Sequence, residues 1–238
     1  MLLASAALAL AATPTLAFEI SVSAGGTTIG LGDLAYSYTP SDDENPGKGG
    51  TYILLAEEDL GVGVLQDWSS SFNIDPFVTN NFVVLNNTAF DQTYTVTVTS
   101  PVFPALSSTL MLGSVGLTVT NNPPTGTATL TSAASTAVYT ALIDGSPVAT
   151  LFSDPYSLSC GATPCSNTDS DDFGIPIPVA GPAANTDMAI QIVFTLSPGD
   201  SGGVTSVFNI EVPEPASLAL LALGLGLVLA QVRFRHLS

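Results

Sequence analysis

The sequence predicts an all-β protein: an antiparallel β-sandwich flanked by an N-terminal signal peptide and a C-terminal transmembrane helix. Three observations lead to this fold class. Apolar residues alternate with polar ones at period two, turn residues separate these short runs, and two continuous apolar segments lie at the ends of the chain. The 238 residues include 21 Gly and 17 Pro, which favours many turns and few helices. A jelly roll is one version of the expected sandwich.

The clearest predicted strand covers residues 93–99, where threonine alternates with tyrosine and valine. Such a strand presents one apolar face to a core and one polar face to solvent. Other short runs rich in Val, Ile, Thr, Tyr and Phe predict strands at residues 18–23, 51–56, 82–85, 117–120, 127–130, 137–143, 148–152, 189–196 and 204–212. Long irregular stretches are expected at residues 40–50 and 154–182, which are acidic and poor in apolar residues.

The first 17 residues consist almost entirely of Ala and Leu. Thr15 and Ala17 supply the small residues that a signal peptidase requires before a cut after Ala17, although no basic residue precedes the apolar run. Residues 1–17 are therefore predicted to be a secretory signal peptide. Residues 18–212 remain as one ectodomain, long enough to build its own core.

The most apolar segment of the chain is residues 216–232. At about 1.5 Å per residue this segment forms a helix of about 26 Å, which just spans the hydrocarbon core of a bilayer. Pro215 is well placed at the start of such a helix. Arg233 and Arg235 follow directly and place the basic tail, residues 233–238, in the cytoplasm.

Pro213-Glu214-Pro215, the apolar span and the two arginines follow one another in an order that resembles the PEP-CTERM sorting signal, here residues 213–238. The resemblance implies that the partner is an exosortase, which cuts near the Pro-Glu-Pro motif and releases or transfers the ectodomain. It also implies a Gram-negative bacterium that makes exopolysaccharide. The expected locations are an inner-membrane anchored precursor, and then the cell surface or the extracellular matrix of a biofilm. These implications do not extend to the activity of the ectodomain.

The charge balance excludes one class of partner. The formal net charge is −17, with 20 acidic and only three basic residues, Lys48, Arg233 and Arg235. Nucleic-acid binding requires a basic surface, so no nucleic acid is expected as a ligand. Of the acidic residues only Glu214 lies beyond residue 212, so the ectodomain alone is strongly anionic and soluble. Neutral glycans, cations or basic surfaces suit it as partners.

Cys160 and Cys165 are the only cysteines, and Pro164 lies between them. An even pair of cysteines in an exported chain predicts a disulfide bond, and the alternative is two free thiols. Because the enclosed loop is short, we expect a modest stabilisation of about 2 kcal/mol and a bond that fixes the loop locally.

A candidate calcium loop follows the second cysteine. Asn167, Asp169, Asp171 and Asp172 supply oxygen side chains, and in a tight turn the alternating ones converge on one hard cation, as in oxygen-ligated Ca²⁺ sites. The spacing does not match an EF-hand, because Pro178 stands where a twelve-residue loop would require Glu. The alternative is a solvated acidic loop, so Ca²⁺ is the one cofactor that this segment suggests.

Residues 199–203, Gly-Asp-Ser-Gly-Gly, match the nucleophile loop of chymotrypsin-like serine proteases letter for letter. That chemistry requires a histidine base, and the only histidine is His236, beyond the predicted membrane span. We therefore expect an ordinary hairpin turn that joins the strands at 189–196 and 204–212. No catalytic residue is assigned and the domain is expected not to be an enzyme.

The expected function is that of an exported protein whose ectodomain is a structural or adhesive component of an exopolysaccharide matrix. One alternative is a Ca²⁺-dependent carbohydrate-binding module, in which Trp68 with Tyr36, Tyr38 and Tyr52 would stack on a sugar ring, although a single Trp more often belongs to a core. A second alternative is a glycoside hydrolase with two facing carboxylates, for which 20 acidic residues offer many pairs and no means of selection.

Overall fold

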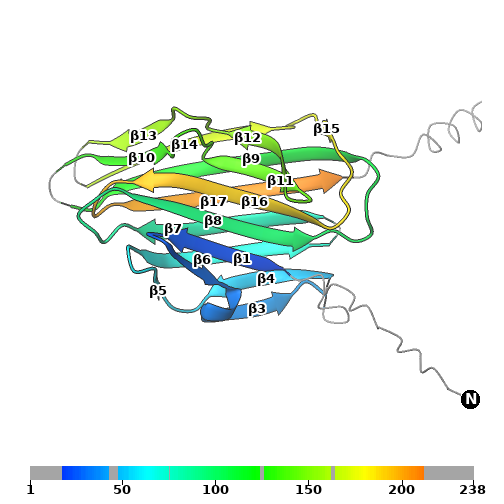
Figure 1. Ribbon diagram of the computed structural model, residues 1–238, viewed down its shortest axis with the longest axis horizontal. Coiled ribbons are helices and arrows are strands. Elements are labelled where there is room, and N and C mark those ends of the chain that lie inside the picture. The colour runs from blue at the N-terminus through cyan, green and yellow to red at the C-terminus, as the bar shows by residue number, and fades with distance from the viewer. Residues whose placement is uncertain (1–17, 43–47, 75, 124–125, 162–163, 212–238) are drawn as a thin grey trace, which may run out of the picture.

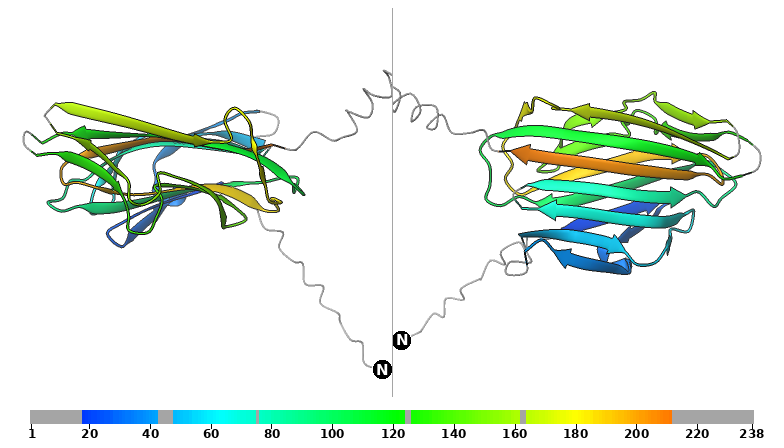
Figure 2. Two further views of the ribbon diagram at one scale, coloured as in Figure 1. Left: turned by 90° about the horizontal axis from the view of Figure 1, so that it is seen from above. Right: turned by 180° about the vertical axis from the view of Figure 1, so that it is seen from behind.

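The structure is a computed structural model that describes residues 18–42, 48–74, 76–123, 126–161 and 164–211. These residues form two antiparallel β-sheets packed face to face (Figures 1 and 2). The described residues contain the 3₁₀ turn Leu31–Asp33 and no α-helix. The predicted antiparallel β-sandwich is therefore confirmed, whereas the jelly-roll version stays a prediction.

Both predicted end segments, the signal peptide at residues 1–17 and the sorting signal at residues 213–238, lie outside the described residues. Within the described part of the chain, no helix has the length and apolar character needed to cross a membrane.

The first sheet, called sheet A, has eight strands. Its main path places β16 and β8 at the centre and the β1–β2 hairpin at one edge. In spatial order the strands are β12 (Ser146–Leu151), β11 (Tyr139–Ile143), β16 (Asp187–Leu196), β8 (Gln92–Pro101), β1 (Glu19–Ala24) and β2 (Thr27–Gly30), with β10 (Ala128–Ser132) pairing β16 and β13 (Ser157–Cys160) pairing β10.

The second sheet, called sheet B, has nine strands. In spatial order these are β14 (Cys165–Phe173), β9 (Thr109–Asn121), β17 (Ser201–Glu211), β7 (Phe77–Leu85), β6 (Val64–Asn73), β4 (Gly49–Leu54) and β3 (Tyr36–Pro40), with β15 (Val179–Gly181) pairing β9 and β5 (Glu58–Asp59) pairing β6. β14 forms one edge, so its outer side pairs with no described strand.

The period-two pattern explains which face of each strand is buried. In β8, Tyr94, Val96 and Val98 are fully buried, while the threonines between them face outward. The strands predicted from such runs are all present, although several extend further than the sequence pattern indicated. β9, for example, begins at Thr109 rather than at residue 117.

The core lies between the sheets and is held by aromatic side chains from both. Phe82 of sheet B stacks on Phe194 of sheet A at a ring distance of 6.2 Å. The hydroxyl of Tyr139, in sheet A, donates a hydrogen bond of 3.0 Å to the carbonyl of Val207, in sheet B. These contacts fix the two layers in register, and burial raises the pKa of Tyr139 far above its ordinary value.

Two sequence predictions about the chain path are wrong. Residues 154–182 are not one irregular stretch, because they contain β13, β14 and β15. Residues 197–200 do not close a hairpin either: β16 lies in sheet A and β17 in sheet B, and the turn carries the chain from one layer to the other. Period-two alternation is the same for a hairpin and for a crossover between sheets, so the pattern did not distinguish them.

The sandwich has two ends along its long axis (Figure 1). At one end, called the terminal end, β1 begins and β17 finishes, so Phe18 and Glu211 both lie there. The opposite end, called the distal end, contains the turn at residues 197–200 and the connection between β13 and β14.

Candidate functional site

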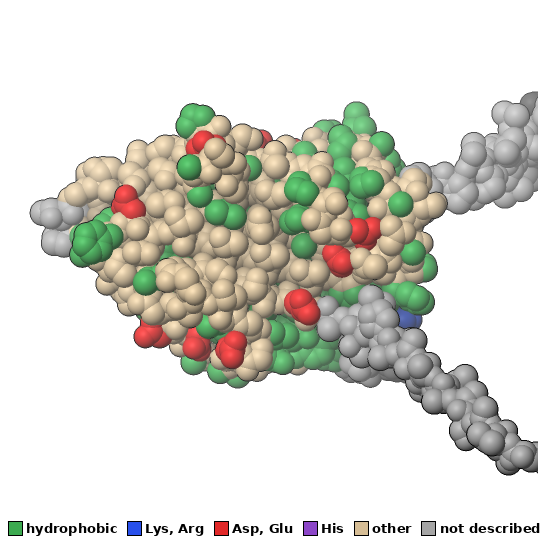
Figure 3. All heavy atoms as spheres, in the orientation of Figure 1, with side chains coloured by type: hydrophobic (Ala, Val, Ile, Leu, Met, Phe, Trp, Pro, Cys, Tyr) green, Lys and Arg blue, Asp and Glu red, His purple; other side chains and the backbone are tan. Residues whose placement is uncertain are grey.

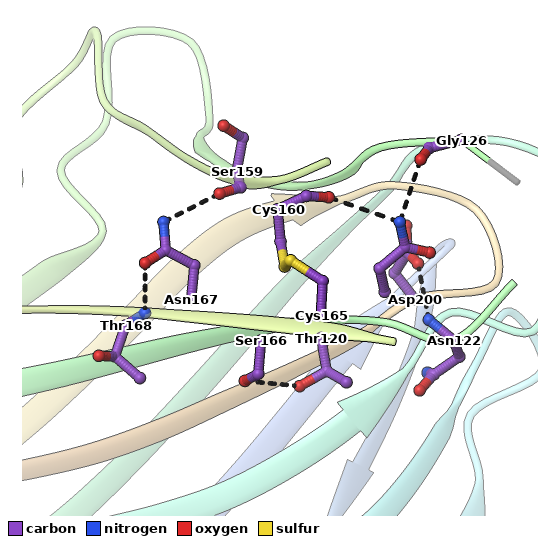
Figure 4. The surroundings of a disulfide bond; sticks show 11 residues. Thr120, Asn122, Gly126, Ser159, Cys160, Cys165, Ser166, Asn167, Thr168 and Asp200 are labelled. Carbon is purple, nitrogen blue, oxygen red and sulfur yellow. Dashed lines mark hydrogen bonds between the residues drawn. A yellow bond between two sulfur atoms is a disulfide. The ribbon is translucent and has the colours of Figure 1, made fainter. Parts of the chain in front are cut away.

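The predicted disulfide between Cys160 and Cys165 is confirmed (Figure 4), and the strand ends that carry it belong to the distal end. Cys160 is the last residue of β13 and pairs with Ala128 of sheet A. Cys165 is the first residue of β14 and pairs with Asn121 of sheet B. With a Cα–Cα distance of 5.9 Å, the bond joins the two sheets at one edge instead of fixing only a local loop.

Buried polar groups surround this bond and close the distal end. The Asn121 side-chain amide donates to the carbonyl oxygens of Gly126 at 3.1 Å and Cys160 at 3.5 Å. The backbone N–H of Asn122 donates to the carboxylate of Asp200 at 3.3 Å (Figure 4). Because Asn121 and Asp200 are each only 3% exposed, these bonds satisfy the polar groups of two buried side chains.

Asp200 and Ser201, the central pair of the protease-like motif, are structural. The Ser197 hydroxyl donates to the Asp200 carboxylate, and the Asn122 side-chain amide donates to the Ser201 hydroxyl at 2.7 Å. Ser201 opens β17, so its backbone follows an ordinary strand. His236 lies outside the described residues. The motif thus serves the crossover between the sheets.

The candidate calcium residues lie on a strand and not in a turn. All four, Asn167, Asp169, Asp171 and Asp172, belong to β14, where successive side chains point to opposite faces. Asn167, Asp169 and Asp171 share one face and Asp172 lies on the other, and residues two apart along a strand are separated by about 7 Å. The prediction of a tight turn that brings these oxygens onto one cation is therefore wrong.

Two of these side chains form hydrogen bonds to residues outside β14. The Asn167 amide donates to the Ser159 carbonyl at 2.9 Å, and Tyr156 donates to the Asp169 carboxylate at 3.1 Å. Burial raises the pKa of Tyr156, and the hydrogen bond to Asp169 raises it further. No group of three or more His, Cys, Asp or Glu residues suited to a metal ion occurs within the described ranges. Calcium binding by this segment stays a prediction without a geometric basis.

Of the aromatic side chains proposed for sugar stacking, Trp68 belongs to the core, and Tyr38 and Tyr52 are partly buried against it. Trp68 is fully buried and its indole N–H donates to the Asn80 side-chain oxygen at 3.1 Å. Tyr52 stacks on Phe18 at a ring distance of 4.7 Å and lies 4.6 Å from the ring of Tyr38. These rings close the edge of the sandwich beside β3, and only Tyr36 is more than a third exposed.

The feature that sequence reasoning missed is a groove on the outer face of sheet B, with a volume of about 650 Å³. Hydroxyl, amide and carboxylate groups from five neighbouring strands line it, among them Asp67, Asn81, Thr118, Thr168, Ser170 and Thr205. The sequence contains the Ser, Thr and Gly residues that face outward from β9 and β17. They can be recognised as one groove only once the register of these two strands is known.

Two glycines form the floor of this groove. Gly116 pairs with Thr205 and Gly203 pairs with Thr118, so the two glycines lie on adjacent strands, β9 and β17. A Cβ at Gly116 would meet nothing closer than the Thr205 carbonyl at 3.9 Å, and one at Gly203 nothing closer than Thr118 at 3.6 Å. Neither glycine is required by the backbone, and their missing side chains leave the hollow open.

The fold and the sequence together define an exported β-sandwich protein with a separate C-terminal processing segment. Residues 211–235 match the family model for the PEP-CTERM protein-sorting motif. This match confirms the resemblance based on Pro213, Glu214, Pro215 and the arginines, and it covers the C-terminal segment alone. It indicates a secreted protein of a Gram-negative bacterium that an exosortase processes. No curated protein matches the chain.

Proposed function

We propose that the protein is made as an inner-membrane anchored precursor, is cut by an exosortase near residues 213–215, and is released as a matrix protein. The β-sandwich then serves as a structural or adhesive component of the exopolysaccharide matrix around the cell. The proposal assigns no catalytic activity to the domain.

The single observation that carries this proposal is the chemistry of the broad outer faces. The outward-facing positions of β8 are Thr93, which is exposed, and Thr95, Thr97 and Thr99, which are half-buried. Thr93 shares a hydrogen bond of 2.8 Å with Thr195 of β16. Figure 3 shows that the face over sheet A is mainly uncharged and polar, with acidic groups scattered near its margins. Hydroxyl groups both donate and accept hydrogen bonds, so such faces suit contact with hydrated neutral polymers.

The disulfide supports a role outside the cell. Disulfides persist in oxidising compartments, and this one ties the two sheets together at the distal end. The bond therefore suits a domain that works in an oxidising compartment.

Fractionation of the matrix tests the proposal. Cells that express the full chain should shed a shortened protein that remains with the exopolysaccharide through washing and is freed when the polysaccharide is digested. A soluble protein that washes away completely from intact matrix would overturn the structural or adhesive role and leave the processing step unaffected.

The groove on sheet B favours a second candidate function, a carbohydrate-binding module. Its volume falls in the range of small-ligand sites, and its lining can form hydrogen bonds with sugar hydroxyls. The carboxylate of Asp67 lies in this lining and disfavours acidic sugars, so the expected ligand is a neutral glycan.

A glycan array with groove-filling variants tests this function. Gly116→Thr and Gly203→Thr should abolish binding without unfolding the domain, because both sites have room for a Cβ. Gly30→Thr in β2 of sheet A is the matched control, since a Cβ there also meets nothing closer than 3.7 Å. Equal binding by all three variants would contradict a site in the groove, and loss of binding with EDTA would support the calcium-dependent version.

A further inference from the structure

Apolar side chains are exposed together at the terminal end of the sandwich. Phe103 is 61% exposed, Ile175 51%, Ile177 79% and Val179 43%. We call these four residues the terminal apolar patch. Burying side chains of this size is favourable by about 1.5 to 3 kcal/mol each, so their exposure suggests a surface that contacts something else.

Hydrogen bonds and strand register place this patch around the end of β17. On one side, Val179 and Ile210 both pair with Met111 of the intervening strand β9. On the other side, the Phe103 N–H donates to the Ile74 carbonyl at 3.3 Å. Two residues further along, the Pro76 carbonyl accepts a hydrogen bond from the N–H of Ile210, near the end of β17. Figure 3 shows apolar side chains gathered over this end of the molecule, where β15 and β17 lie in Figure 1.

The length of chain beyond β17 limits how far this end can lie from a membrane. β17 ends at Glu211, and the predicted apolar span begins at Ala216. Even fully extended, the intervening segment reaches no more than about 18 Å. The headgroup region itself is about 6 Å thick on each side of the hydrocarbon core. An inserted span therefore brings the terminal end close to the lipid surface.

We propose that in the uncleaved precursor the terminal apolar patch lies in the headgroup region of the bilayer. This inference rests on the membrane-anchored precursor of the proposed function. Phe103 and Ile177, the two most exposed members, enter between the headgroups beside the point where the chain joins its membrane span. The contact orients the sandwich and holds residues 212–215 at the membrane surface, where the sorting motif is to be cut.

Charge selects the kind of lipid. Asp144, Asp187 and Glu211 lie at the terminal end. They outnumber the one described cation there, Lys48 beside Phe103, so an anionic lipid surface is repelled overall. A zwitterionic surface, such as phosphatidylethanolamine with phosphatidylcholine, accepts the apolar side chains without this repulsion. The stated partner is therefore a zwitterionic lipid surface.

Fluorescence quenching by spin-labelled lipid tests the contact in the full-length protein. Both native cysteines form the disulfide, so Ile177→Cys introduces the one reactive thiol for an environment-sensitive dye. The control is Phe90→Cys, because Phe90 is 75% exposed but lies just after β7, beside the start of β17 at the distal end. Phe103→Cys provides a second position within the patch.

The labelled proteins are inserted into zwitterionic vesicles that contain lipid with a spin label in the headgroup region, and flotation confirms insertion. Dyes at 177 and 103 should be quenched several-fold more strongly than the dye at 90 and should emit at shorter wavelength. Flotation with equal quenching at 177 and 90 would overturn the lipid contact alone. A blue shift without quenching would show a protein surface, such as a second copy, over the patch and would also overturn it. Failure to float would refute both the anchored precursor and the contact.

Discussion

Removing the bond between Cys160 and Cys165 should destabilise the sandwich by a modest and measurable amount. The perturbation is the double substitution Cys160→Ser with Cys165→Ser, which leaves two small polar side chains at the same places. The two residues are separated by five positions, so the covalent ring is short. Chain-entropy arguments for a ring of this size give a loss of about 2 kcal/mol in the free energy of unfolding.

That loss corresponds to a fall in Tm of about 4 to 8 °C for a domain of this length. Scanning calorimetry and urea unfolding of the released protein measure both quantities. Reduction of the wild-type protein with dithiothreitol should reproduce the effect of the serine pair, and the serine pair itself should not respond to the reductant.

Hydrogen exchange provides a local check. Because the bond joins β13 of sheet A to β14 of sheet B, its loss should speed exchange in these two edge strands more than in central β8. An unchanged Tm, together with unchanged exchange in β13 and β14, would refute the view that the bond holds the two sheets together at this edge.

Two further predictions follow from single contacts, and a third follows from the sorting motif. Burial raises the pKa of Asp144, but hydrogen bonds from Thr186 and its neighbours outweigh this and lower it from 3.8 to about 2. The stabilisation is therefore present above pH 4 and lost as the pH falls towards 2. Asp144→Asn should cost about 1 kcal/mol at pH 7 and almost nothing at pH 2, and an equal cost at both pH values in urea unfolding would contradict this. Tyr139→Phe removes the hydrogen bond to Val207 between the sheets, so urea unfolding should show a loss of about 1 kcal/mol, whereas unchanged stability would show that this bond adds nothing. Replacing residues 213–215 by alanine should retain the full chain in the membrane fraction on immunoblots, and release into the medium would exclude an exosortase cut at this motif.

The sequence was informative where a strand has one buried and one exposed face. In β8 the alternation of threonine with apolar residues matches the burial of Tyr94, Val96 and Val98. The pattern reports burial, so it succeeds only when a second layer covers one face of the strand.

β14 could not be predicted for the same reason. It is an edge strand whose residues between Cys165 and Phe173 are exposed on both faces, and serine, asparagine and aspartate suit such positions. Acidic side chains on an exposed edge also prevent pairing with other chains. A polar segment of this composition is indistinguishable from a loop until its partner β9 is known.

β6 was missed because its alternation is interrupted. A register shift lies between Leu65 and Asp67, and the inward position of Ser70 is polar although fully buried. The bulge moves the apolar residues out of a strict period of two, so the run from Val64 to Asn73 lacks a clear strand pattern.

The sequence alone could not show which distant strands pair with one another. The spacing of Cys160 and Cys165 indicated a bond, but the two cysteines belong to different sheets only because β13 pairs β10 and β14 pairs β9. The groove floored by Gly116 and Gly203 likewise depends on the register of β9 with β17. Local sequence patterns show which face of a strand is buried, whereas the positions of the disulfide and the groove depend on which distant strands pair.

The most direct test of the central claim is the intact mass of the protein recovered from the culture medium of its host. An exported, exosortase-processed protein should begin at Phe18 and end near Pro213, with its disulfide formed and residues 216–232 absent. A released protein that still contains residues 216–232 would contradict the account.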